Sequence, residues 1–363
     1  MPERWYVRVR GMEYGPVDLD TLREWRDEGR VIPHNYLRKE GETTWALAAE
    51  IADLFPRGGA AAAAVPPHLL TQERTLFEII QETCRIYRRG FLQFVALALM
   101  VTLPLMGIEL AFQHLHVREG IRLQEMPRGP LASIVLLVAV LLATWPLFVG
   151  ALQFMTVEAA AGRPLALGSI LRRAMEFWRR IFSVGLFVYG SFLFWTALLL
   201  VAVLAFAAQP TISTLLLTML ALIFHVYMVG RLFINFLFWQ QACTLGELEG
   251  PDALRESKEL ARSRPDLPRL QRPLYRGAIL VSIWLGMALL CSAGVEMPFL
   301  FARLQWVTTL EQGMAIIDAL AKAPAPDAIT IASTAVGSLV SAVLRPLLGI
   351  AFVVLYFDAK ARL

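Results

Sequence analysis

The longest run of apolar positions lies in the middle of the chain. Residues 181–230 contain no Asp, Glu, Lys or Arg, whereas two soluble helices of this length need polar residues on the face that meets water. A bilayer crossing takes about 20 apolar residues, so the run is long enough for two. Gln209-Pro210 separates them, because proline fits the first turn of a new helix. The pattern therefore predicts a transmembrane hairpin.

The same apolar pattern recurs on both sides of this hairpin. Six segments are long enough to cross a bilayer with some tilt, at residues 91–113, 131–157, 181–207, 211–241, 277–301 and 329–356. The chain of 363 residues is 57% hydrophobic, which exceeds the apolar share of an ordinary globular domain. We expect residues 71–363 to form an all-α polytopic membrane bundle.

The first 56 residues lack such long apolar runs and begin with the alternating pattern of a strand. Trp5 to Val9 alternates and is rich in aromatic and β-branched side chains, which predicts a strand. Gly11 and Gly15-Pro16 predict a turn after this strand. These signals indicate a small α/β domain over residues 1–56.

The second half of this small domain is predicted to contain a helix and further strands. Asp18 is expected to cap a helix over residues 19–28, and Gly29 is expected to end it in a left-handed conformation. Residues 31–38 favour a short pair of strands, and Trp45 is expected to close the core.

The small domain carries a set of spaced residues that includes Trp5-Tyr6, Gly15-Pro16, Leu19, Leu22, Gly29-Arg30-Val31 and Trp45. In this order they resemble the bacterial GYF-like domain called GYF domain 2. The resemblance implies a protein or peptide partner, because eukaryotic GYF domains bind proline-rich peptides on an aromatic surface that includes a Gly-Tyr-Phe tripeptide. Gly29-Arg30-Val31 stands at that tripeptide position here and lacks the aromatic pair.

Two interpretations of the aromatic residues remain open. Trp5, Trp25 and Trp45 can form the core of a very small domain, which needs large side chains. Alternatively, Tyr6, Tyr14 and Trp25 line a groove for a proline-rich segment, because aromatic rings fit a polyproline helix.

Low-complexity residues separate the two parts of the chain. Residues 57–70 contain two glycines, a run of alanines and Pro66-Pro67, which predicts a flexible linker. The expected domains are therefore residues 1–56, the linker at 57–70, and the membrane domain at 71–363.

Charge and cysteine content narrow the function classes. Residues 1–56 carry 8 basic and 11 acidic residues, and the remainder carries 26 and 19. The positive excess lies at predicted membrane edges, which indicates topology and contact with membrane lipids rather than nucleic-acid binding. Cys84, Cys243 and Cys291 are scattered and predict neither a disulfide framework nor a zinc site. The N-terminus has no apolar signal core, so we expect no cleaved signal peptide.

Lys and Arg gather on one side of the predicted bundle. They precede the first crossing, fill the loops after the second and fourth, and follow the sixth; examples are Arg88, Arg89, Arg179, Arg180, Arg262, Arg264 and Lys360. The opposite loops hold fewer, although 114–130 carries three arginines. The positive-inside rule predicts a protein of the bacterial inner membrane with both termini in the cytoplasm.

The membrane part also contains an internal repeat. Residues Leu76, Ile79, Tyr87, Arg88, Arg89 and Phe91 recur 91 positions later as Leu167, Ile170, Trp178, Arg179, Arg180 and Phe182. Residues 253–276 form a looser third copy, and Pro146-Leu147 is echoed by Pro346-Leu347. We therefore expect three units, each an interfacial amphipathic helix followed by a hairpin.

The aromatic-Arg-Arg elements and the closing residues 355–362 resemble bacterial membrane domains of the glycerophosphodiester-phosphodiesterase membrane-domain type. The resemblance implies a six-helix membrane domain of uncharacterised function. It implies no enzyme activity here, because the catalytic barrel of those enzymes is absent.

Several polar residues fall within the predicted crossings. A charge in the hydrocarbon costs at least about 2.5 kcal/mol and calls for a partner or a role. The candidates are His225, Arg231, Asn235, Glu296 and Arg345, and Glu109 lies near the end of its crossing. They either pair and reach an interface, or they form a polar pathway that binds an anionic group around Arg231 and Arg345.

No catalytic constellation accompanies these residues. The sequence has no phosphate loop, zinc-protease motif, nucleophile elbow or dinucleotide fingerprint, so we expect neither an enzyme nor a cofactor. His114-x-His116 lacks a third ligand, and no metal site is predicted. The sequence favours an anchor or adaptor whose small domain binds a partner, and the alternative is a small-solute or lipid transporter with a polar site around Arg231.

Overall fold

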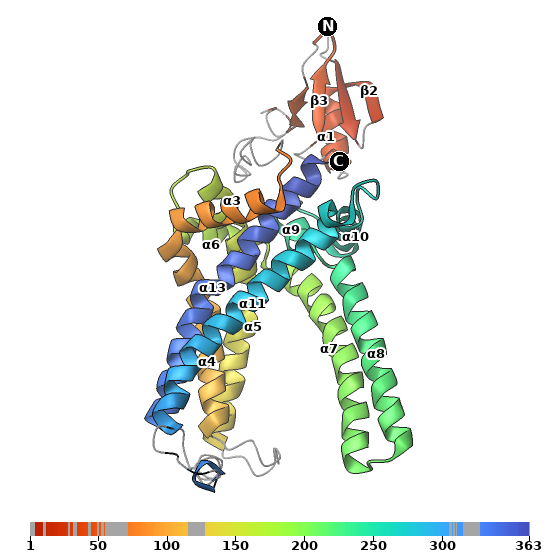
Figure 1. The fold of residues 1–363 in the computed structure, drawn as a ribbon. Coiled ribbons are helices and arrows are strands. Elements are labelled where there is room, and N and C mark those ends of the chain that lie inside the picture. Colours follow the sequence, from red (N-terminus) through yellow and green to blue (C-terminus); the bar gives the residue numbers. More distant parts are fainter. Residues whose placement is uncertain are drawn as a thin grey trace. The chain divides into compact units, whose positions relative to one another are not determined.

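The chain forms two compact units, Met1–Ala64 and Val65–Leu363 (Figure 1). The computed structural model describes residues 4–9, 12–27, 30–31, 35–42, 45–48, 51, 54, 72–114, 128–304, 307, 309, 311–314 and 327–362. The predicted linker at 57–70 lies outside the described residues and stays a prediction.

The first unit is an antiparallel sheet packed against one helix. Its elements are β1 (Arg4–Val9), β2 (Met12–Asp18), α1 (Leu19–Asp27), β3 (Tyr36–Lys39) and β4 (Ala46–Leu47), with strand order β2-β1-β3-β4. Alternate residues of a strand point to opposite faces. Val7 and Leu37 point to one face and are buried with Leu22 of α1, so the core lies between the sheet and the helix.

The predicted turn at Gly15-Pro16 was wrong, because both residues lie within β2. The pairing of β1 with β2 shifts between Trp5 and Val7, and this irregularity admits Gly15 with a φ of 129°. A Cβ on Gly15 would lie 2.6 Å from the Trp5 carbonyl oxygen, so glycine is required there. Pro16 is tolerated because β2 is an edge strand.

The helix is confirmed over Leu19–Asp27, and of the strand pair predicted at 31–38 the described residues show one strand. The predicted helix end at Gly29 and residues 32–34 lie outside the described residues. Thr21 donates its backbone N–H to Asp18 Oδ1 over 2.9 Å, which confirms the cap. Hydrogen bonds from the Thr21 side chain and backbone lower the pKa of the Asp18 carboxyl. The residues described within 31–38 contribute only β3, and Val31 is instead a buried core residue outside any strand.

The second unit contains the six predicted crossings. Among the described residues, six helical segments are long and apolar enough to span a membrane. They are built from α4 (Phe91–His114), α5 (Arg128–Ala160), α7 (Trp178–Ala208), α8 (Ile212–Asn235) with α9 (Trp239–Thr244), α11 (Pro273–Leu304) and α13 (Ala328–Ala361).

The fourth crossing is interrupted, which the sequence did not indicate. The helix ends at Asn235, and α9 begins only at Trp239. Because of the break, the backbone N–H of Phe238 has no partner within its own helix. It donates instead to Ser257 Oγ over 2.9 Å. Ser257 lies on α10 (Gly250–Ala261), so a neighbouring helix supplies the hydrogen bond that the broken helix lacks.

A short amphipathic helix precedes each of three hairpins. These helices are α3 (Leu76–Arg89), α6 (Leu167–Glu176) and α10, and a 3₁₀ turn at Arg269–Gln271 follows α10. Each packs against the second crossing of another hairpin: α3 on α13, α6 on α5, and α10 on α8. We call the end of the bundle that carries them the basic end. The origin of the three units by duplication stays a prediction.

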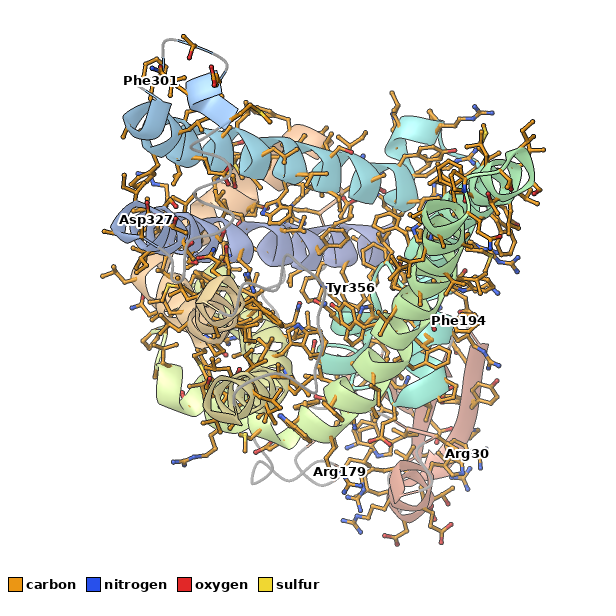
Figure 2. All side chains as sticks on the ribbon, turned by 90° about the horizontal axis from the view of Figure 1, so that it is seen from below. Arg30, Arg179, Phe194, Phe301, Asp327 and Tyr356 are labelled. Atoms are coloured by element: carbon orange, nitrogen blue, oxygen red, sulfur yellow. The ribbon has the colours of Figure 1, made fainter. Side chains whose placement is uncertain are left out.

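The three hairpins do not close into a complete ring. The helix α4 packs against α5 and α13, and α11 packs against α13. The α7–α8 hairpin contacts α5, where a Cβ on Gly185 would lie 2.8 Å from the Trp145 ring. In contrast, α8 and α11 touch at most at isolated points. Figure 1 shows the far half of the α7–α8 hairpin diverging from the other helices, and Figure 2 shows Phe194 well away from Phe301 and Asp327.

Candidate functional site

Buried charges at the basic end form a closed network. Asp358 is buried and accepts hydrogen bonds from the Arg74 backbone N–H at 2.6 Å, Arg276 Nη1 at 2.8 Å and Arg362 Nε at 3.0 Å. Both guanidinium groups also donate to the Arg74 carbonyl oxygen, each over 2.8 Å. The network therefore joins the segment before α3 to the start of α11 and the end of α13.

Carbonyl groups near the internal proline of two helices receive hydrogen bonds from neighbouring helices. In α13, Val343 lies three residues before Pro346, and its carbonyl accepts from the Tyr87 hydroxyl over 2.7 Å. In α5, Ala143 lies three residues before Pro146, and its carbonyl accepts from Trp178 Nε1 over 2.9 Å. The donors occupy matching repeat positions. Neighbouring side chains thus satisfy backbone groups near the proline in both helices.

A cavity of about 530 Å³ lies between these two helices and the α7–α8 hairpin. Trp145 and Arg345, each directly before a helix proline, both line it. Other lining residues of α5 and α13 also lie at equal distances from these two prolines. Its remaining walls come from α7, the broken end of α8, α9 and α11. Gly349 of α13 approaches α5 closely, because a Cβ there would lie 2.3 Å from Leu152 Cδ2. The cavity has the size of an ordinary small-ligand site.

Arg345 is the charged side chain of this lining. The other polar residues are neutral: Tyr189, Gln240, Gln241, Ser292 and Ser341. Within the part of the chain that the structure describes, no hydrogen bond or ion pair is found for the Arg345 guanidinium. The backbone beside it is held by neutral donors, since Trp284 Nε1 donates to the Leu344 carbonyl over 2.9 Å. Arg345 thus faces an apolar cavity without an acidic partner among the described residues.

The other intramembrane candidates lie outside this cavity lining. The Nδ1 atom of His225 lies 3.2 Å from the Trp195 carbonyl oxygen within the α7–α8 hairpin. The Oδ1 atom of Asn235 accepts from Arg262 Nη2 over 3.3 Å. Arg231 is exposed on α8, and Glu296 is exposed on α11. The structure therefore does not bring the five predicted residues together, and the transport alternative around Arg231 gains no support from their placement.

The small domain separates its three candidate peptide-binding residues. Tyr6 follows Trp5 and precedes Val7 on β1, so it points away from the core. Trp25 of α1 packs against the core on the other face, where the Arg30 guanidinium lies 4.6 Å from its ring centre. Tyr14 pairs with Val7 on the edge strand and is exposed. Tyr6 and Trp25 therefore lie on opposite faces of the sheet.

Trp45 does not close the core as predicted. Its ring lies on the outer face, 5.1 Å from the guanidinium carbons of both Arg8 and Arg38. Arg38 also lies 5.0 Å from the Tyr6 ring, and both arginines pair loosely with Glu13. We call Tyr6, Arg8, Arg38 and Trp45 the aromatic–arginine face. Strand alternation could have placed Tyr6 and Arg8 on it, but the pairing of β1 with β3 was needed to add Arg38.

Metal chemistry finds no support in the described residues, which contain no group of three or more His, Cys, Asp or Glu suited to a metal ion. His116 lies outside them, so the predicted absence of a site at His114-x-His116 stays a prediction. Cys243 is buried, and Cys84 is exposed on α3.

The comparisons with known proteins bear on the first unit. A family model, GYF domain 2, matches residues 5–54. No curated protein and no solved structure matches the chain. The matched range covers the described strands and α1 except for Arg4 at the start of β1, which confirms the resemblance seen in the sequence. Residues 5–54 thus form a GYF-like domain that matches GYF domain 2, joined in one chain to six helices that are long and apolar enough to cross a membrane.

Proposed function

We propose that this protein is a multi-pass anchor of the bacterial inner membrane whose GYF-like domain recruits a partner carrying a proline-rich segment. One observation carries the proposal: the match to GYF domain 2 and six membrane-competent helices occur in the same chain. GYF domains in general bind proline-rich peptides, and fusion to a membrane body confines such binding to the membrane surface. The proposed role needs no catalytic step.

The distribution of cations supports a cytoplasmic position for the GYF-like domain. Lys and Arg cluster at the basic end of the bundle, in α3, α6, α10 and the end of α13. The turn between α7 and α8 at the opposite end carries none. Short loops rich in Lys and Arg remain on the cytoplasmic side. On this argument both termini lie in the cytoplasm.

The aromatic–arginine face supports the choice of a peptide partner. Tyr6 and Trp45 supply rings against which a polyproline helix packs. Arg8 and Arg38 hold these rings in place and leave a net positive charge, because Glu13 balances only one of them. The face therefore favours a proline-rich segment with acidic residues beside the prolines.

Peptide binding by the full-length protein tests this proposal. The protein in lipid nanodiscs is titrated with a labelled oligoproline peptide that ends in glutamates. We expect saturable binding that Trp45→Ala weakens at least about tenfold, since a central aromatic residue carries much of such an interface. Tyr14→Ala is the matched control, because this exposed ring lies on the other face of the sheet.

Two results would contradict the proposal. Absence of binding to any proline-rich probe would remove the recruiting role, and a reporter fused after Leu363 that is active in the periplasm would remove the topology. If Tyr14→Ala weakens binding and Trp45→Ala does not, the peptide site lies on the face that carries α1 instead.

A further inference from the structure

The unpaired guanidinium of Arg345 is the starting observation. Elsewhere in the described helices, the buried cations Arg276 and Arg362 share the carboxylate of Asp358. A cation held in apolar surroundings without a counter-ion is costly. Since the described residues provide Arg345 with no anion, a ligand in the cavity that it lines is the remaining source of one.

Arg345 lies close enough to the membrane boundary at the basic end for its long side chain to reach a lipid phosphate. Asp327 caps α13 at the end opposite the basic end, by accepting from the Thr330 backbone N–H over 2.8 Å. Arg345 lies 18 residues further on, which corresponds to about 27 Å of helix. The hydrocarbon core is about 30 Å thick, so Arg345 lies inside it, close to the boundary at the basic end.

The walls of the cavity are suited to acyl chains next to a polar headgroup. Most of its lining is apolar, including Phe148, Phe192, Phe236 and Leu348. Three tryptophans, Trp145, Trp239 and Trp284, also contribute, and tryptophan is the residue typical of the boundary between headgroups and hydrocarbon. Ser341 and Gln240 add neutral hydrogen-bonding groups in the same lining.

The cavity opens toward the surface of the bundle that faces lipid. Its lining passes from the buried Val188 and Leu237 to the exposed Ser292 and Ser341. Phe233 of α8 and Ala288 of α11 stand on two sides of it, and these two helices do not pack along their lengths. Acyl chains can therefore leave the cavity sideways, between α8 and α11, without crossing a packed interface.

We propose that this cavity binds one anionic phospholipid from the leaflet at the basic end, with its phosphate on Arg345 and its acyl chains leaving between α8 and α11. The lipid supplies the missing counter-ion and covers the apolar walls at the same time. It also fills the interface that is left open between the second and third hairpins. The site is independent of the GYF-like domain and of peptide binding.

Lipid retention by the purified full-length protein tests the proposal. The protein is delipidated in detergent and then titrated with phosphatidylglycerol, and bound lipid is counted by native mass spectrometry. We expect one tightly held phosphatidylglycerol, at least tenfold weaker binding in Arg345→Leu, and weak binding of phosphatidylcholine. The matched control is Arg231→Leu, because Arg231 is an exposed cation on α8 outside the cavity lining, and we expect it to retain the lipid.

A second variant and a second ligand keep the test decisive. Ala288→Trp fills the cavity while Arg345 remains, and we expect it to exclude the lipid as well. Inorganic phosphate alone is expected to leave the thermal midpoint unchanged, since it cannot use the apolar walls. Equal loss in Arg231→Leu, retention in both cavity variants, or a full shift by inorganic phosphate would each overturn the assignment.

Discussion

Two charged sites on α13 lie about 20 Å apart along the same helix and are built in opposite ways. At Asp358, two guanidinium groups and a backbone N–H converge on one buried carboxylate. At Arg345, the described residues provide no partner for the charge, and the surrounding wall is mostly apolar. At the first site the chain itself supplies the counter-ion, whereas at the second the described residues supply none.

This contrast separates a structural ion pair from a binding residue by its surroundings rather than by its residue type. The Asp358 network joins three segments that are far apart in sequence, so its removal should cost stability. The Arg345 guanidinium makes no hydrogen bond or ion pair with the described residues, so its substitution should abolish ligand binding without lowering stability. Substitutions at the two sites are therefore expected to change stability in opposite directions.

The largest effect is expected at Asp358. In Asp358→Ala, the buried Arg276 loses its counter-ion and Arg362 keeps only its ion pair with Glu73, and breaking a buried pair in this way costs about 3–5 kcal/mol. Glu158 is a matched control, because it lies twelve residues after Pro146 as Asp358 lies twelve after Pro346, and it pairs with the partly exposed Arg163. Glu158→Ala should cost no more than about 1 kcal/mol. Unfolding of both variants in detergent measures the difference, and equal losses would contradict the contrast.

A smaller effect of opposite sign is expected at Arg345. In lipid-free detergent, Arg345→Leu removes an uncompensated charge from apolar surroundings and should raise stability by about 1–3 kcal/mol. Adding phosphatidylglycerol should stabilise the unmodified protein and leave the variant unchanged. Thermal unfolding with and without the lipid measures both terms. A variant that is destabilised in the absence of lipid would show that Arg345 is a structural residue after all.

The smallest effect is expected at the neutral hydrogen bond beside Arg345. Tyr87→Phe removes the donor to the Val343 carbonyl and should cost about 1 kcal/mol. Tyr275→Phe is the matched control, because this exposed tyrosine stands at the corresponding place in the third, looser repeat. Thermal unfolding of the two variants side by side gives the comparison. A loss in Tyr275→Phe as large as in Tyr87→Phe would show that the cost comes from removing a tyrosine hydroxyl in general and not from losing the bond to Val343.

The crossings could be predicted from the sequence because the bilayer leaves few alternatives. A stretch such as residues 181–230 has no charge and can satisfy its backbone in lipid only as helices. The break at Phe236–Phe238 could not be predicted, because no proline or glycine marks it. Its cause is tertiary, since Ser257 receives the freed N–H.

The cavity was beyond sequence reasoning for the same reason. Hydropathy placed both Arg231 and Arg345 in crossings, but only packing shows that Arg345 lines the cavity and that Arg231 does not. In the small domain, Trp45 was assigned to the core on size alone. Its neighbours across β1 and β3 place it with Arg8 and Arg38 instead. The position of a charge within a crossing and the size of an aromatic ring can both be read from the sequence. Neither shows which residue lies opposite in the folded protein.

The hydrogen bond from Tyr87 to Val343 spans 256 positions of the chain. A ribosome needs roughly 13 to 50 s to synthesise that length at bacterial or slower rates. Throughout that interval the first amphipathic helix has been made but lacks its final neighbour, and the Arg74 backbone also waits for Asp358. The earliest helix of the membrane unit thus completes its packing only when the last one has been made, and a chain truncated before α13 leaves the Tyr87 hydroxyl and the Arg74 backbone N–H without these partners.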